Sequence, residues 1–224
     1  MSEVLYTPQL VTRGGSHSRH ANFNALIELM NVVIALAALV FALPIMLAIG
    51  FAIFLQDGGP VLFAHRRIGR DGRIFRCLKF RSMAVDAEAR LAELLARDPQ
   101  ARAEWEADHK LRNDPRVTKL GAFLRKSSLD ELPQLFNVLR GEMSLVGPRP
   151  IVDAEVAKYG RRFRQYCAVK PGITGLWQIS GRNDTSYRTR VALDCLYATR
   201  RSLLLDAQVL LATVPAVLMR RGSY

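Results

Sequence analysis

Cysteine and histidine are scarce in this chain of 224 residues, which contains three of the first and four of the second. Cys77, Cys167 and Cys195 lie far apart and form no CxxC pair, so a disulfide framework is not expected. The histidines are scattered at spacings typical of neither a zinc site nor a Ser-His catalytic pair. These absences favour a reducing, cytoplasmic compartment.

Acidic residues are fewer than basic ones: the chain has 20 Asp and Glu and 32 Lys and Arg, which gives a formal net charge of +12. Such an excess indicates an anionic partner, which is a nucleic acid, a phosphorylated ligand or an acidic lipid surface. Charge alone does not choose among the three. Internal repeats and low-complexity linkers are absent as well, and the length suits one domain with a short membrane segment.

Charge is nearly missing from residues 25–55, where Glu28 is the one charged residue in ALIELMNVVIALAALVFALPIMLAIGFAIFL. Soluble helices are rarely this apolar all round, so the run predicts a membrane segment. A continuous helix over these residues would be about 46 Å long, whereas the hydrocarbon core of a bilayer is about 30 Å thick. We expect Pro44 to break the helix and leave a second arm too short to cross.

Basic residues flank this run on both sides, with Arg13 and Arg19 before it and a cluster of Lys and Arg in residues 66–81 after it. Positive charge on both sides favours keeping both ends in the cytoplasm. We therefore predict a re-entrant hairpin, a helix-break-helix that dips into one leaflet and returns. A single membrane-spanning anchor is the alternative that these residues leave open.

The rest of the chain predicts a mainly α fold with a small β-hairpin (α+β), in which interfacial amphipathic helices surround a compact cytoplasmic catalytic domain. The expected organisation is a polar, flexible segment over residues 1–24, the membrane hairpin over residues 25–55 and the catalytic domain over residues 56–224. Within that domain we expect strands at 61–63 and 74–80 around the turn Gly69–Gly72, an amphipathic helix over 84–112, and an interfacial or core helix over 203–219.

The segment Ser127-Ser128-Leu129-Asp130-Glu131-Leu132-Pro133 carries the first candidate catalytic residues. Its hydroxyls, early acids and proline predict the start of a helix, with Asp130 and Glu131 at the positive end. Carboxylates there suit a divalent cation shared with a diphosphate, and an aspartate can attack phosphorus as a nucleophile. The alternative is that the two acids cap the helix and catalyse nothing.

Four basic residues are candidates for holding a diphosphate: Lys79, Arg125, Arg149 and Arg182. The planar fork of arginine suits phosphate oxygens, and positioning with charge neutralisation provides most of the catalysis in phosphoryl transfer. Any single arginine of this kind can equally be a solvated surface group. Arg149 is the strongest candidate, because Pro148 and Pro150 stiffen the backbone around it.

Three blocks, LKFRSM, SLDELPQLFNVLRGEMSLVGPRP and KPGITGLWQISGRND, follow the apolar run in this order. Together they resemble the bacterial sugar transferase family of monotopic phosphoglycosyl transferases, and within it the ExoY-type undecaprenyl-phosphate galactose phosphotransferases of exopolysaccharide synthesis. The resemblance covers residues 25–224. One departure is Leu43-Pro44 at the hairpin break, where family members commonly carry Ser-Pro.

The resemblance implies a ping-pong reaction on the cytoplasmic face of the bacterial inner membrane. The family aspartate, matched by Asp130, attacks the β-phosphorus of a UDP-sugar, UMP leaves, and undecaprenyl phosphate then takes the sugar phosphate. Glu131 assists with Mg²⁺, which both acids would ligate. The polar family positions lining the site are matched by Lys79, Arg125, Arg149, Arg182 and Asp206. The apolar segment and the basic charge then serve anionic membrane lipid and diphosphate, and nucleic acid is not an expected partner.

Two other functions stay open from the residues. The chain can be a non-catalytic, membrane-anchored protein that binds acidic lipid or nucleic acid through its positive charge. An ordinary glycosyltransferase, which releases UDP, is disfavoured because no Asp-x-Asp metal motif of that class is recognisable. The sequence does not fix the sugar, for which the resemblance favours galactose before glucose, and it leaves a homodimer open without a heptad pattern to support one.

Overall fold

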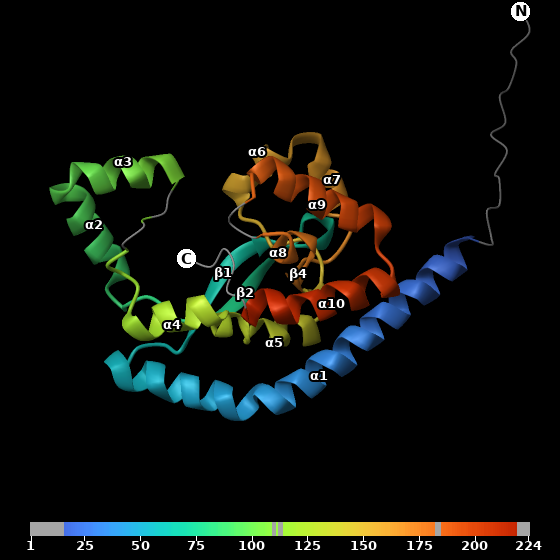
Figure 1. The fold of residues 1–224 in the computed structure, drawn as a ribbon, viewed down its shortest axis with the longest axis horizontal. Coiled ribbons are helices and arrows are strands. Elements are labelled where there is room, and N and C mark those ends of the chain that lie inside the picture. The colour runs from blue at the N-terminus through green and yellow to red at the C-terminus, as the bar shows by residue number, and fades with distance from the viewer. Residues whose placement is uncertain (1–15, 109–110, 112–113, 182–184, 219–224) are drawn as a thin grey trace, which may run out of the picture.

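A computed structural model of the chain describes residues 16–108, 111, 114–181 and 185–218. Helices dominate, and the strands form two small sheets (Figure 1), so the predicted α+β class is confirmed. The elements in chain order are α1 (Ser16–Asp57), β1 (Leu62–Ile68), η1 (Arg70–Gly72), β2 (Ile74–Phe80), α2 (Ala87–Arg97), α3 (Pro99–Asp108), α4 (Lys119–Ser127), η2 (Leu129–Glu131), α5 (Gln134–Leu139), β3 (Ser144–Val146), η3 (Asp153–Glu155), α6 (Val156–Tyr159), η4 (Gly160–Arg162), α7 (Phe163–Tyr166), β4 (Gly172–Thr174), α8 (Leu176–Ile179), α9 (Tyr187–Arg200) and α10 (Leu203–Leu218).

The predicted hairpin is formed by β1 and β2, which pair in antiparallel register from Leu62↔Phe80 to Ile68↔Ile74. β1 is longer than the predicted residues 61–63, because pairing continues up to the η1 turn. Directly opposite residues of antiparallel strands share a face, and side chains alternate along each strand. His65 and Arg67 therefore lie on the same face of the hairpin as Lys79.

The second sheet was not predicted. β3 and β4 pair in parallel, with Ser144 opposite Gly172 and Val146 opposite Thr174. Strands of three residues carry too little periodicity to be recognised in a sequence. The chain segments beside these two strands also approach closely. Gly147 directly follows β3, and a Cβ on it would lie 2.5 Å from the carbonyl oxygen of Lys170, which lies just before β4. This pairing fixes the start of the Pro148–Pro150 segment.

The single helix predicted over residues 84–112 is wrong. The segment forms two helices, α2 and α3, and Asp98 between them is extended, with φ −118° and ψ 102°. The residue before a proline is biased away from the helical region, and the Asp98 carboxylate instead accepts hydrogen bonds from the backbone N–H groups of Gln100 and Ala101. Pro99 thus ends one helix and begins the next. The helix predicted over 203–219 is confirmed as α10, which contains Pro215 without being interrupted.

α1 is one continuous helix that contains Pro44, so the expected separation into two helices is wrong. It also begins at Ser16, before the expected boundary at residue 25. Proline removes one backbone hydrogen bond, which bends a helix without having to end it. Figure 1 shows the bend in the middle of α1, which passes under the rest of the chain.

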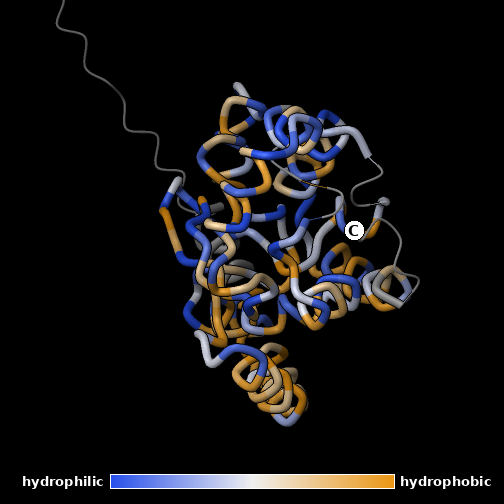
Figure 2. Tube along the Cα trace, turned by 90° about the vertical axis from the view of Figure 1, so that its left-hand side faces the viewer, coloured by the Kyte–Doolittle hydropathy of each residue, from blue (hydrophilic) through white to orange (hydrophobic). Residues whose placement is uncertain are grey.

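One face of α1 packs on the domain and the other is apolar and exposed. Ile27, Ala35, Met46, Ile49 and Ile53 are buried. The exposed apolar residues include Leu29, Val33, Leu36, Val40, Phe41, Leu43, Leu47, Phe51 and Leu55. Residues Ala25–Asp57 are long and apolar enough to cross a membrane by length and composition. Figure 2 shows α1 as a largely hydrophobic tube beneath the other elements.

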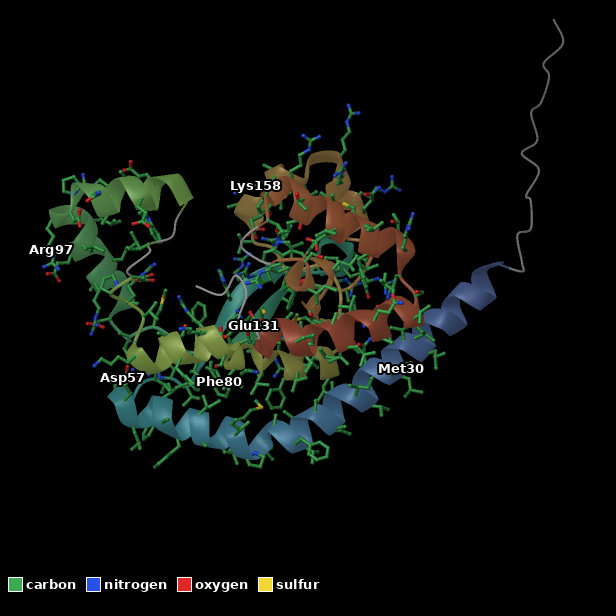
Figure 3. The ribbon with its side chains drawn as sticks, in the orientation of Figure 1. Met30, Asp57, Phe80, Arg97, Glu131 and Lys158 are labelled. Atoms are coloured by element: carbon green, nitrogen blue, oxygen red, sulfur yellow. The ribbon has the colours of Figure 1, made fainter. Side chains whose placement is uncertain are left out.

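Polar contacts hold both ends of this apolar stretch on the same domain. Near its start, Asn31 donates to Ser144 Oγ over 3.0 Å and accepts from the backbone N–H of Leu145 over 2.8 Å. Glu28 Oε1 lies 2.9 Å from Lys170 Nζ. At its end, Asp57 pairs with Arg81 of the segment after β2. Figure 3 labels Met30 and Asp57 near these two contact regions.

α5 lies at the centre of the fold and holds β2 in place through Asn137, which is fully buried. The Asn137 side chain accepts from the backbone N–H of Leu78 over 2.9 Å and donates to the carbonyl oxygen of Arg76 over 2.8 Å and to Glu142 over 2.6 Å. These bonds fix β2 at residues 76 and 78, directly before Lys79. β2 therefore holds Lys79 in a fixed position beside α5.

We predict that Asn137→Ala lowers the free energy of unfolding by about 2–4 kcal/mol, because it leaves buried backbone groups of β2 without partners. Thermal unfolding in detergent micelles measures the change. Glu93→Ala is the matched control, since Glu93 is 69% exposed in a helical pair with Arg97, and its Tm should equal that of the unaltered chain. Equal Tm values for the two variants would contradict the role given to Asn137.

Candidate active site

The segment that carries the predicted catalytic acids joins the end of α4 to the start of α5. Ser127 Oγ donates to the carbonyl oxygens of Phe123 and Leu124, and Ser128 adopts a left-handed conformation with φ 58°. These features end α4. Ser128 is also the N-cap position of η2, but it makes no side-chain cap hydrogen bond there, so the predicted capping by the serine hydroxyls is wrong. Asp130 and Glu131 lie in the short 3-10 turn η2, and Pro133 occupies the N-cap position of α5.

Neither acid caps a helix. The N-cap residues of η2 and α5 are Ser128 and Pro133, and neither makes a side-chain cap hydrogen bond. The two carboxylates converge instead on Lys79, whose Nζ lies 2.6 Å from Glu131 Oε1 and 3.6 Å from Asp130 Oδ2. Figure 3 shows Glu131 near the centre of the molecule. The capping alternative thus does not describe what these side chains do.

Asp130 is 7% exposed, and this burial raises the pKa of its carboxyl above the ordinary value. Lys79 opposes the rise in the pKa and Glu131 adds to it, while Arg125 and Arg149 oppose it from farther away. A buried carboxylate is poorly solvated, so its charge depends on these cations. The arrangement places a poorly solvated carboxyl group among positive charges.

Arg149 and Arg125 reach the acids from two other elements. Arg149 NH1 lies 3.8 Å from Glu131 Oε1, and its guanidinium carbon lies 5.4 Å from the centre of the Trp177 ring. The backbone around Arg149 is fixed, because Gly147 N–H donates to Thr174 and Ile68 N–H donates to Ile151. Arg125 on α4 donates from Nε to Ser82 Oγ over 2.8 Å.

Two predicted site residues remain, and one of them, Asp206, stands apart from this cluster. Arg182 lies outside the described residues. Asp206 on α10 accepts a hydrogen bond of 2.7 Å from the hydroxyl of Tyr197, which also lies 2.9 Å from the carbonyl oxygen of Val146. Asp206 is not among the residues that line the cleft beside Asp130. Its observed contact is therefore that of a structural acceptor between α9 and α10.

A cleft of about 1070 Å³ contains the acids and the three basic residues together. Small-molecule sites have volumes of roughly 300–1,000 Å³, so the cleft has room for a ligand as large as a nucleotide sugar. Its walls come from α1, the β1–β2 hairpin, the segment before α2, the α4–η2–α5 junction, the segment before η3, β4, α8 and α10.

The donor set at Asp130 and Glu131 suits a magnesium ion that substrate phosphates help to bind. Mg²⁺ is commonly held by one or two carboxylates, with phosphate oxygens and water completing its six ligands. Within the described ranges no group of three or more His, Cys, Asp and Glu side chains forms a metal cluster. A site of two carboxylates fits the predicted ion only when a diphosphate provides the remaining charge.

The sequence did not reveal Asp194, which supports Arg149 from α9. Asp194 is 1% exposed, accepts a hydrogen bond of 2.6 Å from the Tyr159 hydroxyl, and accepts another from the backbone N–H of Arg149. Its burial raises its pKa to about 6, although these hydrogen bonds and Arg190 act in the opposite direction. A lone acid in a helix carries no spacing signal, so only its burial identifies it.

Arg67 was also missed as a cleft residue, having been read only as part of a basic flank. Its NH1 donates to the carbonyl oxygen of Pro150 over 3.1 Å, and its NH2 lies 3.0 Å from His65 Nδ1. The alternation of β1 contained the signal, since Arg67 lies on the same face as Lys79 once the hairpin register is known.

Comparison with known proteins gives one family over nearly the whole chain. Residues 23–220 match the family described as bacterial sugar transferase. The UDP-galactose-lipid carrier transferase of Erwinia amylovora is 53% identical over 190 residues, which are 85% of this chain and 40% of that protein. The undecaprenyl-phosphate galactose phosphotransferase of Salmonella typhimurium is 52% identical over 194 residues, which are 87% of this chain and 40% of that protein.

A third relative has a length close to that of this chain. The exopolysaccharide production protein ExoY of Sinorhizobium fredii is 50% identical over 194 residues, which are 87% of this chain and 86% of that protein. By contrast, the chain spans about two fifths of the length of the two longer relatives.

We predict that Asp194→Asn changes how stability depends on pH. The folded-state pKa of about 6 lies above the unfolded value of 3.8, so the folded chain binds more protons between these values. Relative to the variant, which cannot titrate there, the unaltered chain should therefore lose about 2–3 kcal/mol of stability as the pH rises from 4 to 7. Denaturant unfolding of both at several pH values measures the difference, and a constant difference would refute the assignment.

Proposed function

Since this chain belongs to the bacterial sugar transferase family, we propose that it moves a sugar 1-phosphate from a UDP-sugar to undecaprenyl phosphate and releases UMP. The sugar is galactose or glucose, and the step is the first membrane step of exopolysaccharide synthesis. The names of the relatives support a lipid carrier as acceptor, galactose phosphate as the transferred group and exopolysaccharide production as the pathway. The convergence of Asp130, Glu131, Lys79 and Arg149 in one cleft is the observation that carries the proposal.

In the first half-reaction an Asp130 carboxylate oxygen attacks the β-phosphorus of the UDP-sugar. The bond from that phosphorus to the bridging oxygen breaks, and UMP leaves with the bridging oxygen and its electron pair. The product on the enzyme is a mixed anhydride between Asp130 and the sugar phosphate. The position of Asp130 supports this role, because its carboxyl is buried in the cleft with Lys79 Nζ 3.6 Å away, which places a positive charge beside the attacking group.

In the second half-reaction a phosphate oxygen of undecaprenyl phosphate attacks the same phosphorus. The bond between phosphorus and the Asp130 oxygen breaks, which restores the carboxylate and forms the diphosphate-linked lipid sugar. Both donor and acceptor are anionic, so the charge near the acids has to be positive in each half. Lys79 and Arg149 lie beside Glu131, and Arg125 lines the same cleft. We assign these three to the phosphate oxygens, and Arg182 stays a predicted phosphate ligand.

Asp130 and Glu131 would hold Mg²⁺ together with the diphosphate. The ion would neutralise charge on the phosphate oxygens and the leaving UMP. Of the two carboxylates, Asp130 lies farther from the Lys79 ammonium group: the distance from Nζ is 3.6 Å to Asp130 Oδ2 and 2.6 Å to Glu131 Oε1. Asp206, which we first expected in the site, acts instead through Tyr197 in holding α9 against α10.

We propose further that α1 enters one leaflet of the inner membrane and returns, with the catalytic domain on the cytoplasmic face. A helix crossing a core of about 30 Å would carry one of its ends away from the domain. The contacts of Glu28 with Lys170 and of Asp57 with Arg81 instead tie both ends of the apolar stretch to that domain. The exposed apolar face between them would lie in lipid beside the acidic head groups that the basic surface attracts.

We predict that Asp130→Asn abolishes release of UMP from a UDP-sugar, lowering its rate about a thousandfold or more, while membrane binding is unchanged. The amide retains the size of the carboxylate but is a poor nucleophile. Asp153→Asn, which alters an exposed acid of η3, is the matched control and should keep the full rate. Chromatography of the nucleotide product also separates the alternatives: release of UDP would indicate an ordinary glycosyltransferase, and no nucleotide release from the unaltered chain would indicate a binding protein.

The re-entrant arrangement predicts the side of the membrane on which residue 10 lies. A Leu10→Cys variant in a chain whose native cysteines are replaced by serine should react with an impermeant thiol reagent only after the cells are opened. A cysteine at exposed Asp153 serves as the cytoplasmic control. Labelling of position 10 in intact cells would mean that α1 spans the membrane.

A further inference from the structure

The cleft that contains Asp130 and Glu131 has two chemically different parts. The polar part is formed by α4 and the segments around it, where Arg125 donates to Ser82 Oγ. Its lining includes Ser82, Arg116, Arg125, Ser127 and Ser128 together with apolar residues of the segment before α2, such as Met83 and Val85. The apolar part is formed by α1, α5, β4 and α10, and its lining residues are Ala38, Ala42, Leu132, Leu135, Ile173, Thr174 and Thr213. Asp130 and Glu131 lie at the junction, directly before Leu132 in the chain.

The hydroxyl groups of the two threonines in the apolar part, Thr174 and Thr213, form hydrogen bonds within the protein. Thr213 Oγ1 donates to the carbonyl oxygen of Val209 over 2.7 Å, so its contact of 2.7 Å with Thr174 is one in which Thr174 donates. Both hydroxyl protons are thereby committed. A ribose or a base placed here would find neither threonine proton free to donate, whereas a hydrocarbon chain needs no donor.

The apolar part is continuous with the exposed apolar surfaces of two helices. Ala38 and Ala42 lie one turn apart on α1, and their neighbours Val40 and Phe41 are 64% and 86% exposed. On α10, Thr213 lies beside Val214, which is 60% exposed. A chain leaving the cleft between these helices therefore meets apolar surface on both sides.

We propose that this apolar part receives the first isoprene units of the acceptor lipid, while the polar part receives the nucleotide of the donor. The assignment rests on the proposed function and extends it by giving each substrate its own side of Asp130. Charge complementarity supports it. The acceptor phosphate would lie at Lys79 and Arg149 with its hydrocarbon tail running between α1 and α10, and Arg125 remains for the phosphate that leaves with uridine.

The small size of Ala42 makes the proposal testable, because a phenyl ring there would fill the space between α1 and α10. The first half-reaction is measured as release of UMP in a single turnover, with UDP-sugar and no acceptor. The second is measured as transfer of sugar phosphate from the preloaded enzyme to undecaprenyl phosphate in micelles. Ala48→Phe is the matched control, since Ala48 lies on the exposed face of the same helix.

We expect Ala42→Phe to release UMP within about twofold of the normal rate and to slow transfer to the lipid at least about tenfold. Ala48→Phe should alter neither rate. The retained release of UMP shows that the variant is folded. Thr213→Phe, which fills the same space from α10, should reproduce the selective loss and provides an independent measurement if Ala42→Phe does not fold.

Two results would overturn the proposal. If both half-reactions fall together in folded Ala42→Phe and Thr213→Phe, the apolar part is not dedicated to the acceptor. If neither falls, the lipid is bound elsewhere. An unaltered enzyme that releases no UMP contradicts the proposed function itself, so the two failures are distinguishable.

Discussion

The ion pairs that Lys79 makes with Glu131 and Asp130 are the interaction on which the site depends. They join a strand of the hairpin to the turn between α4 and α5, and they place one positive charge against two partly or largely buried carboxylates. Removing the lysine would leave uncompensated charge in a poorly solvated place, which is costly in any fold. The fold provides for this pairing on both sides, since Asn137 holds β2 and the left-handed Ser128 turns the chain so that both acids face the strand.

The position of α1 connects this site to the membrane. Its buried face packs against the domain, and the two ends of its apolar stretch are tied to Lys170 and Arg81. Ala38 and Ala42 near its middle line the cleft of Asp130. In the proposed re-entrant arrangement, a helix held in this way would bring lipid next to the carboxylates without carrying the domain across the bilayer. The same constraint explains why Glu28 and Asn31 occur in a run that is otherwise apolar, because both face the domain and have partners there.

The sequence predicted the fold class and the β-hairpin of β1 and β2. It also predicted five residues that the structure gathers in one cleft, namely Asp130, Glu131, Lys79, Arg125 and Arg149. It succeeded where a residue pattern has a local physical cause, as with strand alternation or two prolines around an arginine. It was wrong where tertiary contacts decide. The hydroxyls of Ser127 and Ser128 do not cap the start of a helix, Pro44 bends α1 without dividing it, and Pro99 separates two helices. Two further features join residues that are distant in the chain: the parallel pairing of β3 with β4 and the buried contact of Asp194 with Arg149. No pattern within one segment predicts either of them.

The central claim is that Asp130 becomes covalently bonded to the sugar phosphate of the donor. The direct measurement is mass spectrometry of the enzyme after brief reaction with UDP-sugar in the absence of lipid, followed by peptide mapping. The account predicts one added sugar phosphate per chain, located on the peptide at Asp130, which disappears when undecaprenyl phosphate is added. An adduct on another residue, or lipid product formed by an enzyme that never carries an adduct, would contradict it.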